Sequence, residues 1–161
     1  MLINHRRPVA PSEALLFALL LVAVISQSQA AECSLVKPLG LIESAFRTGK
    51  PEPLTSLMPQ EGKVFLALDS LGGGVGYFSH DQVYFILGGI FNRNETINFS
   101  VKPQKPSNVN ADRRRPDSGL TYCVGSWSYH RHDGARSENQ IFFVLSMRKG
   151  VWSLVEIREA Q

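Results

Sequence analysis

The residues that could perform acid–base chemistry in this sequence are few and lie far apart along the chain. Asp69 and His130 are the two candidates, because a carboxylate and an imidazole can exchange a proton when they meet within hydrogen-bond reach in a pocket. Their spacing does not tie one to the other. They support an enzymatic alternative, a hydrolase or isomerase. The motifs Gly-x-Ser-x-Gly and His-Glu-x-x-His do not occur.

A second candidate constellation is the segment His130-Arg131-His132-Asp133. Imidazole and carboxylate groups are zinc ligands, but spacing identifies no third or fourth ligand elsewhere. Asp133-Gly134 is also a typical hairpin turn. We therefore expect a solvated hairpin tip here, with no metal and no cofactor.

The two cysteines, Cys33 and Cys123, could form a disulfide. An even number of cysteines favours pairing in an oxidising compartment. The alternative is two separate thiols, with Cys123 as a small buried residue in a strand.

Glycines are concentrated in the stretch "LGGGVGYFSHDQ", residues Leu71–Gln82. The dinucleotide fingerprint Gly-x-Gly-x-x-Gly fails, because Tyr77 and Ser79 occupy the positions of its last glycine. No lysine follows in the manner of a phosphate loop. The stretch is therefore expected to be a flexible, tight connection from a strand to a capped helix.

Aromatic residues are the more informative set. A cavity lined by aromatic side chains can hold a flat or apolar molecule. The alternative is that most of these side chains pack in the core or in a dimer contact. The candidate ligand-binding residues are Tyr77, Tyr84, Phe99, Trp127 and Tyr129. An aromatic set without a convincing acid–base pair favours non-catalytic binding of a small molecule or a protein partner.

The N-terminus has the pattern of a secretory signal peptide over residues 1–30, which predicts an exported protein, periplasmic or secreted. Arg6-Arg7 precede the apolar run Ala14–Ile25, and Ser28 and Ala30 fit a cleavage site. A membrane anchor is the alternative, although about 20 apolar residues are needed to span a bilayer. Residues 31–161 then form a single domain. The formal net charge of +3 is too weak to predict nucleic acid or a membrane surface as partner.

Apolar periodicity predicts three helices ahead of the long strands. Helical spacing covers Pro38–Thr48, with Gly49 as the stop, and a short helix covers Pro53–Met58. A third helix begins after Ser79, which forms a capping box with Gln82. Gly88-Gly89 inside that third helix is expected to face another backbone in the sheet closely.

Period-two alternation predicts the strands. The predicted strands are Lys63–Ser70, Glu95–Lys102, Gly119–His130 (with Gly125 as a candidate bulge), Asn139–Arg148 and Val151–Glu159. Asp133-Gly134 and Lys149-Gly150 are the hairpin turns between the last three, and Pro103–Ser118 is a long polar loop. Helices and strands are segregated, which indicates an α+β domain with N-terminal helices packed on a strongly curved antiparallel sheet.

The segments "GYFSHDQVYFILGGIF" and "IFFVLSMRKGVWSLVEIRE" carry a family resemblance. With the order of elements, they resemble small exported bacterial proteins of unknown function that have the nuclear transport factor two-like fold. The similarity covers about Leu35–Glu159. It implies a cone-shaped cavity, often a ligand or active site, and frequent dimerisation through the outer sheet face.

The last two predicted strands carry apolar residues on both faces. Ile141, Phe143, Leu145 and Met147 alternate with Phe142 and Val144, and Val155 and Ile157 alternate with Trp152 and Leu154. Helices can cover only one face of such a sheet, and large exposed apolar patches are unusual on monomers. A homodimer through the outer sheet face is therefore expected.

Overall fold

The computed structural model describes residues 35–104 and 119–160. Contacts divide the chain into two units, Met1–Val36 and Lys37–Gln161. The predicted signal peptide, Cys33 and residues 105–118 of the predicted loop lie outside the described residues. No helix within the two described stretches is long and apolar enough to cross a membrane.

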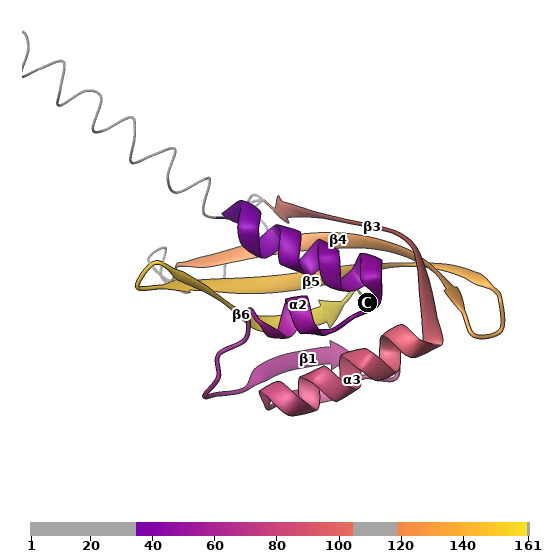
Figure 1. Cartoon of the computed structure of the whole chain (residues 1–161), viewed down its shortest axis with the longest axis horizontal. Coiled ribbons are helices and arrows are strands. Elements are labelled where there is room, and N and C mark those ends of the chain that lie inside the picture. Colours follow the sequence, from indigo (N-terminus) through magenta and orange to yellow (C-terminus); the bar gives the residue numbers. More distant parts are fainter. Residues whose placement is uncertain (1–34, 105–118, 161) are drawn as a thin grey trace, which may run out of the picture. The chain divides into compact units, whose positions relative to one another are not determined.

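Three helices form where apolar spacing predicted them (Figure 1). The first covers residues 35–48 and ends at Gly49, whose φ of +64° is a conformation that glycine adopts readily. Helix α2 (Glu52–Thr55) is shorter than predicted, but hydrogen bonds from Leu57 and Met58 to carbonyls three residues earlier continue the turn. Helix α3 spans His80–Arg93.

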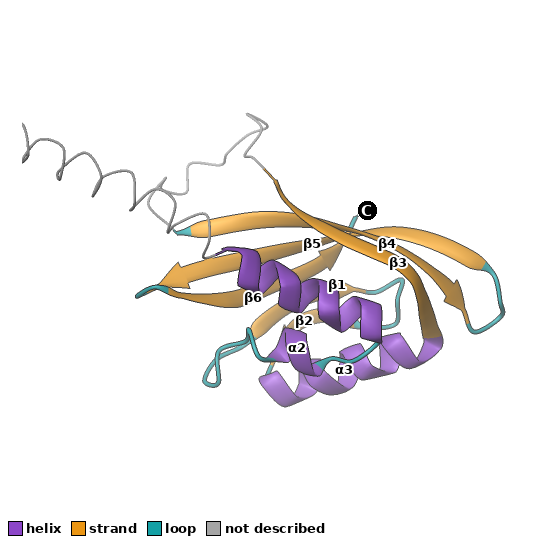
Figure 2. Cartoon of the chain, turned by 45° about the horizontal axis from the view of Figure 1, so that its top comes forward, coloured by secondary structure: helices purple, strands orange, loops and turns teal. Residues whose placement is uncertain are grey.

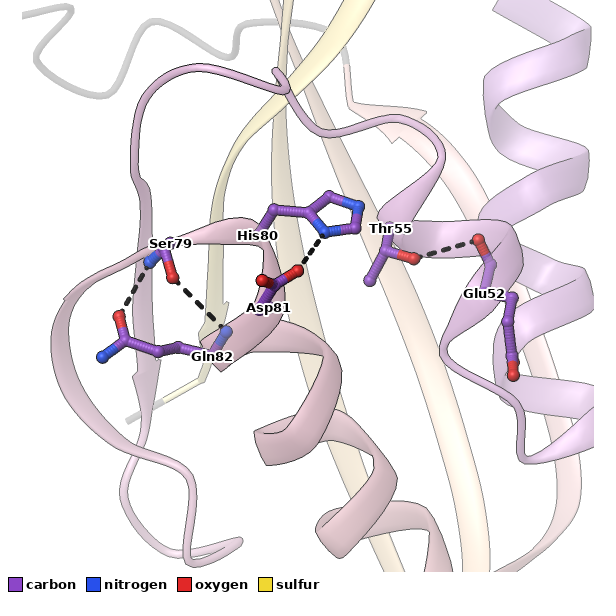
Figure 3. Close-up of polar contacts among 6 residues, drawn as sticks. All are labelled: Glu52, Thr55, Ser79, His80, Asp81 and Gln82. Atoms are coloured by element: carbon purple, nitrogen blue, oxygen red, sulfur yellow. Dashed lines mark hydrogen bonds and ion pairs between the residues drawn. The ribbon is translucent and has the colours of Figure 1, made fainter.

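The capping box at the start of α3 is present as predicted (Figure 3). The Ser79 backbone N–H donates to Gln82 Oε1 at 2.9 Å, and the Gln82 backbone N–H donates to Ser79 Oγ at 3.4 Å. The apolar stripe of the helix, Val83, Leu87 and Ile90, is buried. The helix therefore begins where its sequence satisfies the otherwise unpaired N–H groups of the first turn.

Six strands form one sheet, in the order β2-β1-β6-β5-β4-β3. Their bounds are β1 (Val64–Leu68), β2 (Gly74–Phe78), β3 (Asn94–Gln104), β4 (Leu120–Arg131), β5 (Arg136–Arg148) and β6 (Val151–Glu159). The helices lie on one face of this sheet (Figure 2). We call that face the inner face and the opposite one the outer face.

The predicted α+β architecture, with helices packed on a sheet, is confirmed, and the sheet is mixed because one of its strand pairs is parallel. β1 runs parallel to β6, with Leu66 opposite Ile157, whereas every other pair is antiparallel. The physical reason is topological: β1 does not pair with the next long strand in the chain. It pairs with the last strand, and the periodicity of a single strand does not show which remote strand will be its neighbour.

The glycine-rich stretch forms a hairpin turn and a strand, and is not the simple connection that was expected. Gly72 N donates to the Asp69 carbonyl at 2.9 Å, and Gly73 N donates to the Leu68 carbonyl at 2.8 Å. The chain then returns along β1 as the edge strand β2. A Cβ at Gly73 would lie 2.8 Å from Leu68 Cβ, so the turn requires glycine for close packing.

Two further details of the strands differ from prediction. Gly125 is not a bulge, since the ladder runs through it regularly on both sides. β6 has a bulge between Leu154, which is opposite Leu145, and Glu156, which is opposite Val144. The bulge places the side chains of Leu154 and Ile157 on the same, inner face of the sheet. Leu154 N donates to the Leu57 carbonyl at 2.8 Å, a bond outside the ladder that accompanies the bulge.

Candidate functional site

Three of the predicted ligand-binding residues, Phe99, Trp127 and Tyr129, come together on the inner face. The first two are directly opposite each other on β3 and β4, and Trp127 stacks on Tyr129 with ring centroids 4.2 Å apart. Phe46 of the first helix stacks on Phe99 at 4.2 Å and meets Trp127 edge-on at 5.2 Å. All four rings are buried, so they pack mainly against one another.

The polar atoms of this aromatic cluster also have protein partners. Trp127 Nε1 donates to Thr96 Oγ1 at 2.9 Å. Burial is the main cause of a raised pKa at the Tyr129 hydroxyl, which also interacts with Ser137. The cluster therefore behaves as a satisfied core, and a ligand could enter it only by displacing packed rings.

The other two predicted residues, Tyr77 and Tyr84, lie elsewhere. Tyr77 is on the edge strand β2 and is 68% exposed on the outer face. Tyr84 is on α3, where its hydroxyl donates to Glu52 Oε1 at 3.0 Å. This hydrogen bond, which only the neutral hydroxyl can donate, is the main cause of a raised pKa at Tyr84, and the negative charge of Glu52 raises it further. The five aromatic residues thus do not form one site.

Asp69 and His130, the acid–base alternative, are not brought together. Asp69 is exposed in the turn after β1, and His130 is exposed near the end of β4. Strands β6 and β5 lie between β1 and β4, which at about 4.8 Å per strand places them about 14 Å apart across the sheet. An acid–base pair within hydrogen-bond reach would have to use other residues.

The His130–Asp133 segment forms the predicted hairpin tip between β4 and β5. Arg131 N donates to the Ala135 carbonyl at 2.9 Å, and Gly134 N donates to the Arg131 carbonyl at 2.8 Å. Asp133 forms an ion pair with Arg131 at 3.5 Å. Across residues 35–104 and 119–160, no group of three histidine, cysteine or carboxylate side chains could hold a metal ion.

Solved structures resemble this arrangement. A DUF4783 family protein from Bacteroides ovatus has a TM-score of 0.52 and 17% identity, over 73% of this chain and 89% of its own. BvnE pinacolase from Penicillium brevicompactum has a TM-score of 0.53 and 16% identity, over 79% of each chain. A variant of a protein named Rd1NTF2_05 has a TM-score of 0.52 and 14% identity, over 84% of this chain and 99% of its own.

The chain has a nuclear transport factor two-like (NTF2-like) fold. No family model matches its sequence. No curated protein matches it either. At these identities the solved structures establish the NTF2-like fold, and the resemblance inferred from the sequence is confirmed at that level.

The outer face of the NTF2-like sheet carries two apolar rows that cross five strands. Register places the members of each row side by side, with one charged residue of β6 in each. The rows are Tyr122, Val144, Glu156, Phe65 and Tyr77, and Val124, Phe142, Arg158, Ala67 and Val75. We call them the outer-face rows.

The two charged residues of the outer-face rows are already paired. Arg158 Nε lies 3.5 Å from Glu156 Oε1, and its guanidinium lies 5.4 Å from the centre of the Phe142 ring. Near the sheet edge, Val75 is 62% exposed and Tyr77 68% exposed. The rows could therefore be covered by another surface without leaving an isolated charge buried.

Cys123 lies fully buried on the inner face of β4 and has no disulfide partner among the described residues. Burial raises its pKa to about 11, so the reactive thiolate is suppressed at neutral pH. Its predicted disulfide partner, Cys33, lies outside the described residues, and their pairing remains a prediction.

Sequence reasoning missed Phe85, which is 74% exposed on α3. It lies off the apolar stripe that was used to predict the helix. Its position off the stripe could have been noticed in the sequence. A large aromatic residue on the polar side of a helix is expected to be exposed, because it has no core to enter. Beside Tyr84 and Phe85 lies an open groove of about 550 Å³.

Proposed function

We propose that this protein is an exported, non-catalytic binding domain that makes its contacts through surfaces of the NTF2-like fold. Its first partner is a second copy of itself, bound through the outer sheet face. The observation that carries this proposal is the pair of outer-face rows, which combine exposed apolar side chains with an internally paired charge at their centre.

Physical chemistry supports burying this face. Removing exposed apolar area from water lowers the free energy of the system. Val75 and Tyr77 on β2 are both exposed. Glu156 and Arg158 satisfy each other, which lowers the cost of covering them. A twofold contact would place the same rows of two copies against each other.

Binding of a small apolar molecule in or around the aromatic cluster is the narrower version of this proposal. Phe99, Trp127 and Tyr129 supply suitable rings, but they are packed against each other and Phe46. This version therefore requires the first helix to move away from β3 and β4. Surface association requires no such opening, which is why we place it first.

An enzyme of the hydrolase or isomerase type is the alternative function. A pinacolase is among the solved structures that share the fold, yet a common fold does not carry a reaction with it. Asp69 follows β1 and His130 lies on β4, and two strands separate β1 from β4. The two candidates therefore do not form a convergent acid–base pair.

The outer-face contact can be tested by the mass of the full chain in solution. Sedimentation velocity at micromolar concentration should give more than one chain per particle, and Tyr77→Glu should lower that mass. Tyr77 is exposed, so the substitution should not disturb folding. Val151→Glu is the matched control, since Val151 is exposed beside the β5–β6 turn and outside the rows. Equal masses for Tyr77→Glu and the unmodified chain would contradict the proposal.

A further inference from the structure

The two outer-face rows are complementary to each other, strand by strand. On β4, β5, β1 and β2, one row has an aromatic side chain where the other has a smaller aliphatic one. On β6, one row has the carboxylate of Glu156 and the other has the guanidinium of Arg158. Because β6 is the middle one of the five strands, the two charges lie at the centre of the apolar surface.

This pattern distinguishes between two ways of packing two copies face to face. A twofold axis between the sheets can run across the strands, and each row then faces the other row of the second copy. Phe65 then faces Ala67, and Tyr77 faces Val75. If the axis runs along β6 instead, each row faces itself in reverse order, and the two Glu156 carboxylates meet. Only the first arrangement places large side chains against small ones and unlike charges against each other.

The charged pair at the centre can accept a second pair. Within one chain, Arg158 Nε and Glu156 Oε1 are 3.5 Å apart, and the two side chains are still 49% and 28% exposed. A guanidinium has five N–H donors, and a carboxylate accepts several hydrogen bonds. Each group therefore retains bonding capacity toward a partner of opposite charge.

We propose that two copies pack row against row about a twofold axis that runs across the strands, with Glu156 of each copy paired with Arg158 of the other. This inference rests on the outer-face association proposed above, and it names the residues that make a second copy the preferred partner. Another apolar surface without these charges would leave them buried with fewer partners. Packed sheets are rotated by about 30° relative to each other, so facing residues stay closest together at the centre, on β6.

Exchanging the charges tests this pairing in the full chain. Glu156→Arg gives a surface with two positive charges, and Arg158→Glu gives one with two negative charges. Alone, each variant should associate more weakly than the unmodified chain by roughly tenfold or more, because like charges face each other. An equimolar mixture of the two should recover two-chain particles in sedimentation velocity. The double exchange, Glu156→Arg with Arg158→Glu in one chain, should recover them as well.

A second ion pair provides the matched control. Arg136 Nη2 and Glu138 Oε1 on β5 are 2.9 Å apart and lie outside the rows. Glu138→Arg and Arg136→Glu change the charge by the same amounts, and each should associate like the unmodified chain. Circular dichroism checks that all variants are folded.

The outcomes separate this inference from the proposed function. If the unmodified chain is single at micromolar concentration, both are overturned. If its mass falls with Tyr77→Glu but the mixture of the two charge variants does not associate, only the pairing of Glu156 with Arg158 is overturned. Equal effects of the row variants and the control variants would also overturn it.

Cross-linking tests the direction of the axis. The Glu156→Arg chain carries Tyr77→Cys and the Arg158→Glu chain carries Val75→Cys, both with Cys33→Ser. A short bifunctional thiol reagent should link the two chains, since both positions are exposed. In the control mixture, Tyr122→Cys replaces Val75→Cys, because Tyr122 would face Tyr77 only if the axis ran along β6. No link through position 75, or a link of equal or higher yield through position 122, would overturn the proposed axis.

Discussion

Neighbouring aromatic rings leave room only for glycine at position 125. A Cβ there would lie 2.5 Å from Phe99 Cζ and 3.1 Å from Phe143 Cε2, and both rings are buried. Gly125→Ala is therefore expected to lower the free energy of unfolding by about 1–3 kcal/mol through overpacking. Urea denaturation followed by circular dichroism measures this. No loss of stability would mean that the Phe99 ring can move away.

The buried thiol of Cys123 predicts both low reactivity and a pH dependence. In a Cys33→Ser chain, a thiol reagent at pH 8 should label Cys123 only after unfolding, because the protein interior shields it and disfavours the thiolate. Its pKa rises from 9.0 to about 11 in the folded chain. Between about pH 9 and pH 11 only the unfolded thiol ionises. The free energy of unfolding is therefore unaffected by this thiol below about pH 9 and falls as the pH rises toward 11.

The matched control for Cys123 is Cys123→Ala in the same Cys33→Ser chain. Urea midpoints at pH 8, 9 and 10 should fall less steeply with pH in this variant. Parallel pH profiles for the two chains would contradict the assignment. Rapid labelling of native Cys123 would contradict its burial.

At the scale of elements, α3 depends on its first turn. Ser79→Ala removes the oxygen that accepts the Gln82 backbone N–H, and should cost about 1 kcal/mol of unfolding free energy. Ser79→Asp should retain most of the stability, because aspartate is an equally good N-cap. Equal losses in the two variants, measured by urea denaturation, would show that the cap contributes nothing specific.

The glycines of α3 predict the opposite sign of effect. Gly89→Ala should raise the stability of the single chain by about 1 kcal/mol, since alanine is the better helix former and its Cβ meets only a flexible arginine end. The expectation that Gly88 and Gly89 closely face another backbone is therefore wrong. The measurement is urea denaturation of Gly89→Ala beside the unmodified chain at the same concentration. A loss of stability would mean that α3 needs glycine for internal packing.

Local sequence signals predicted the elements that carry them. The Ser79–Gln82 box, Gly49 and the Lys149-Gly150 turn are each determined by a few adjacent residues, and each lies where it was predicted. Strand β2 was missed because its alternating glycines hide a pattern of only three apolar residues. The bulge in β6 was missed because it accompanies a contact with Leu57, which is remote in the chain.

At the scale of the whole molecule, the proposed export predicts where the N-terminus of the processed chain lies. Expression of the full chain in a bacterium with a periplasm should yield a protein that begins at Ala31, because Ser28 and Ala30 fit the cleavage site. Subcellular fractionation and mass spectrometry of the intact product measure this. Ala30→Asp should block cleavage, whereas Gln29→Asn should not. An uncleaved, soluble wild-type chain would contradict the predicted leader.

The candidate site was less predictable than the fold. Sequence could identify Phe99, Trp127 and Tyr129 as a group because they alternate on strands that pair directly. It could not separate them from Tyr77 and Tyr84, since the face of each depends on register across remote strands. Nor could it show that Phe46 would fill the space between the rings.

The parallel pairing of β1 with β6 has a consequence for the order in which the chain can fold. Among the described strands, β6 alone joins the β1–β2 hairpin to strands β3 to β5 within the sheet. Until residues 151–159 are synthesised, the sheet exists at most as two unconnected pieces, each with an open edge. Closure must wait for a contact of high sequence separation, which slows folding. The growing chain therefore keeps its sheet unclosed until β6 has been synthesised.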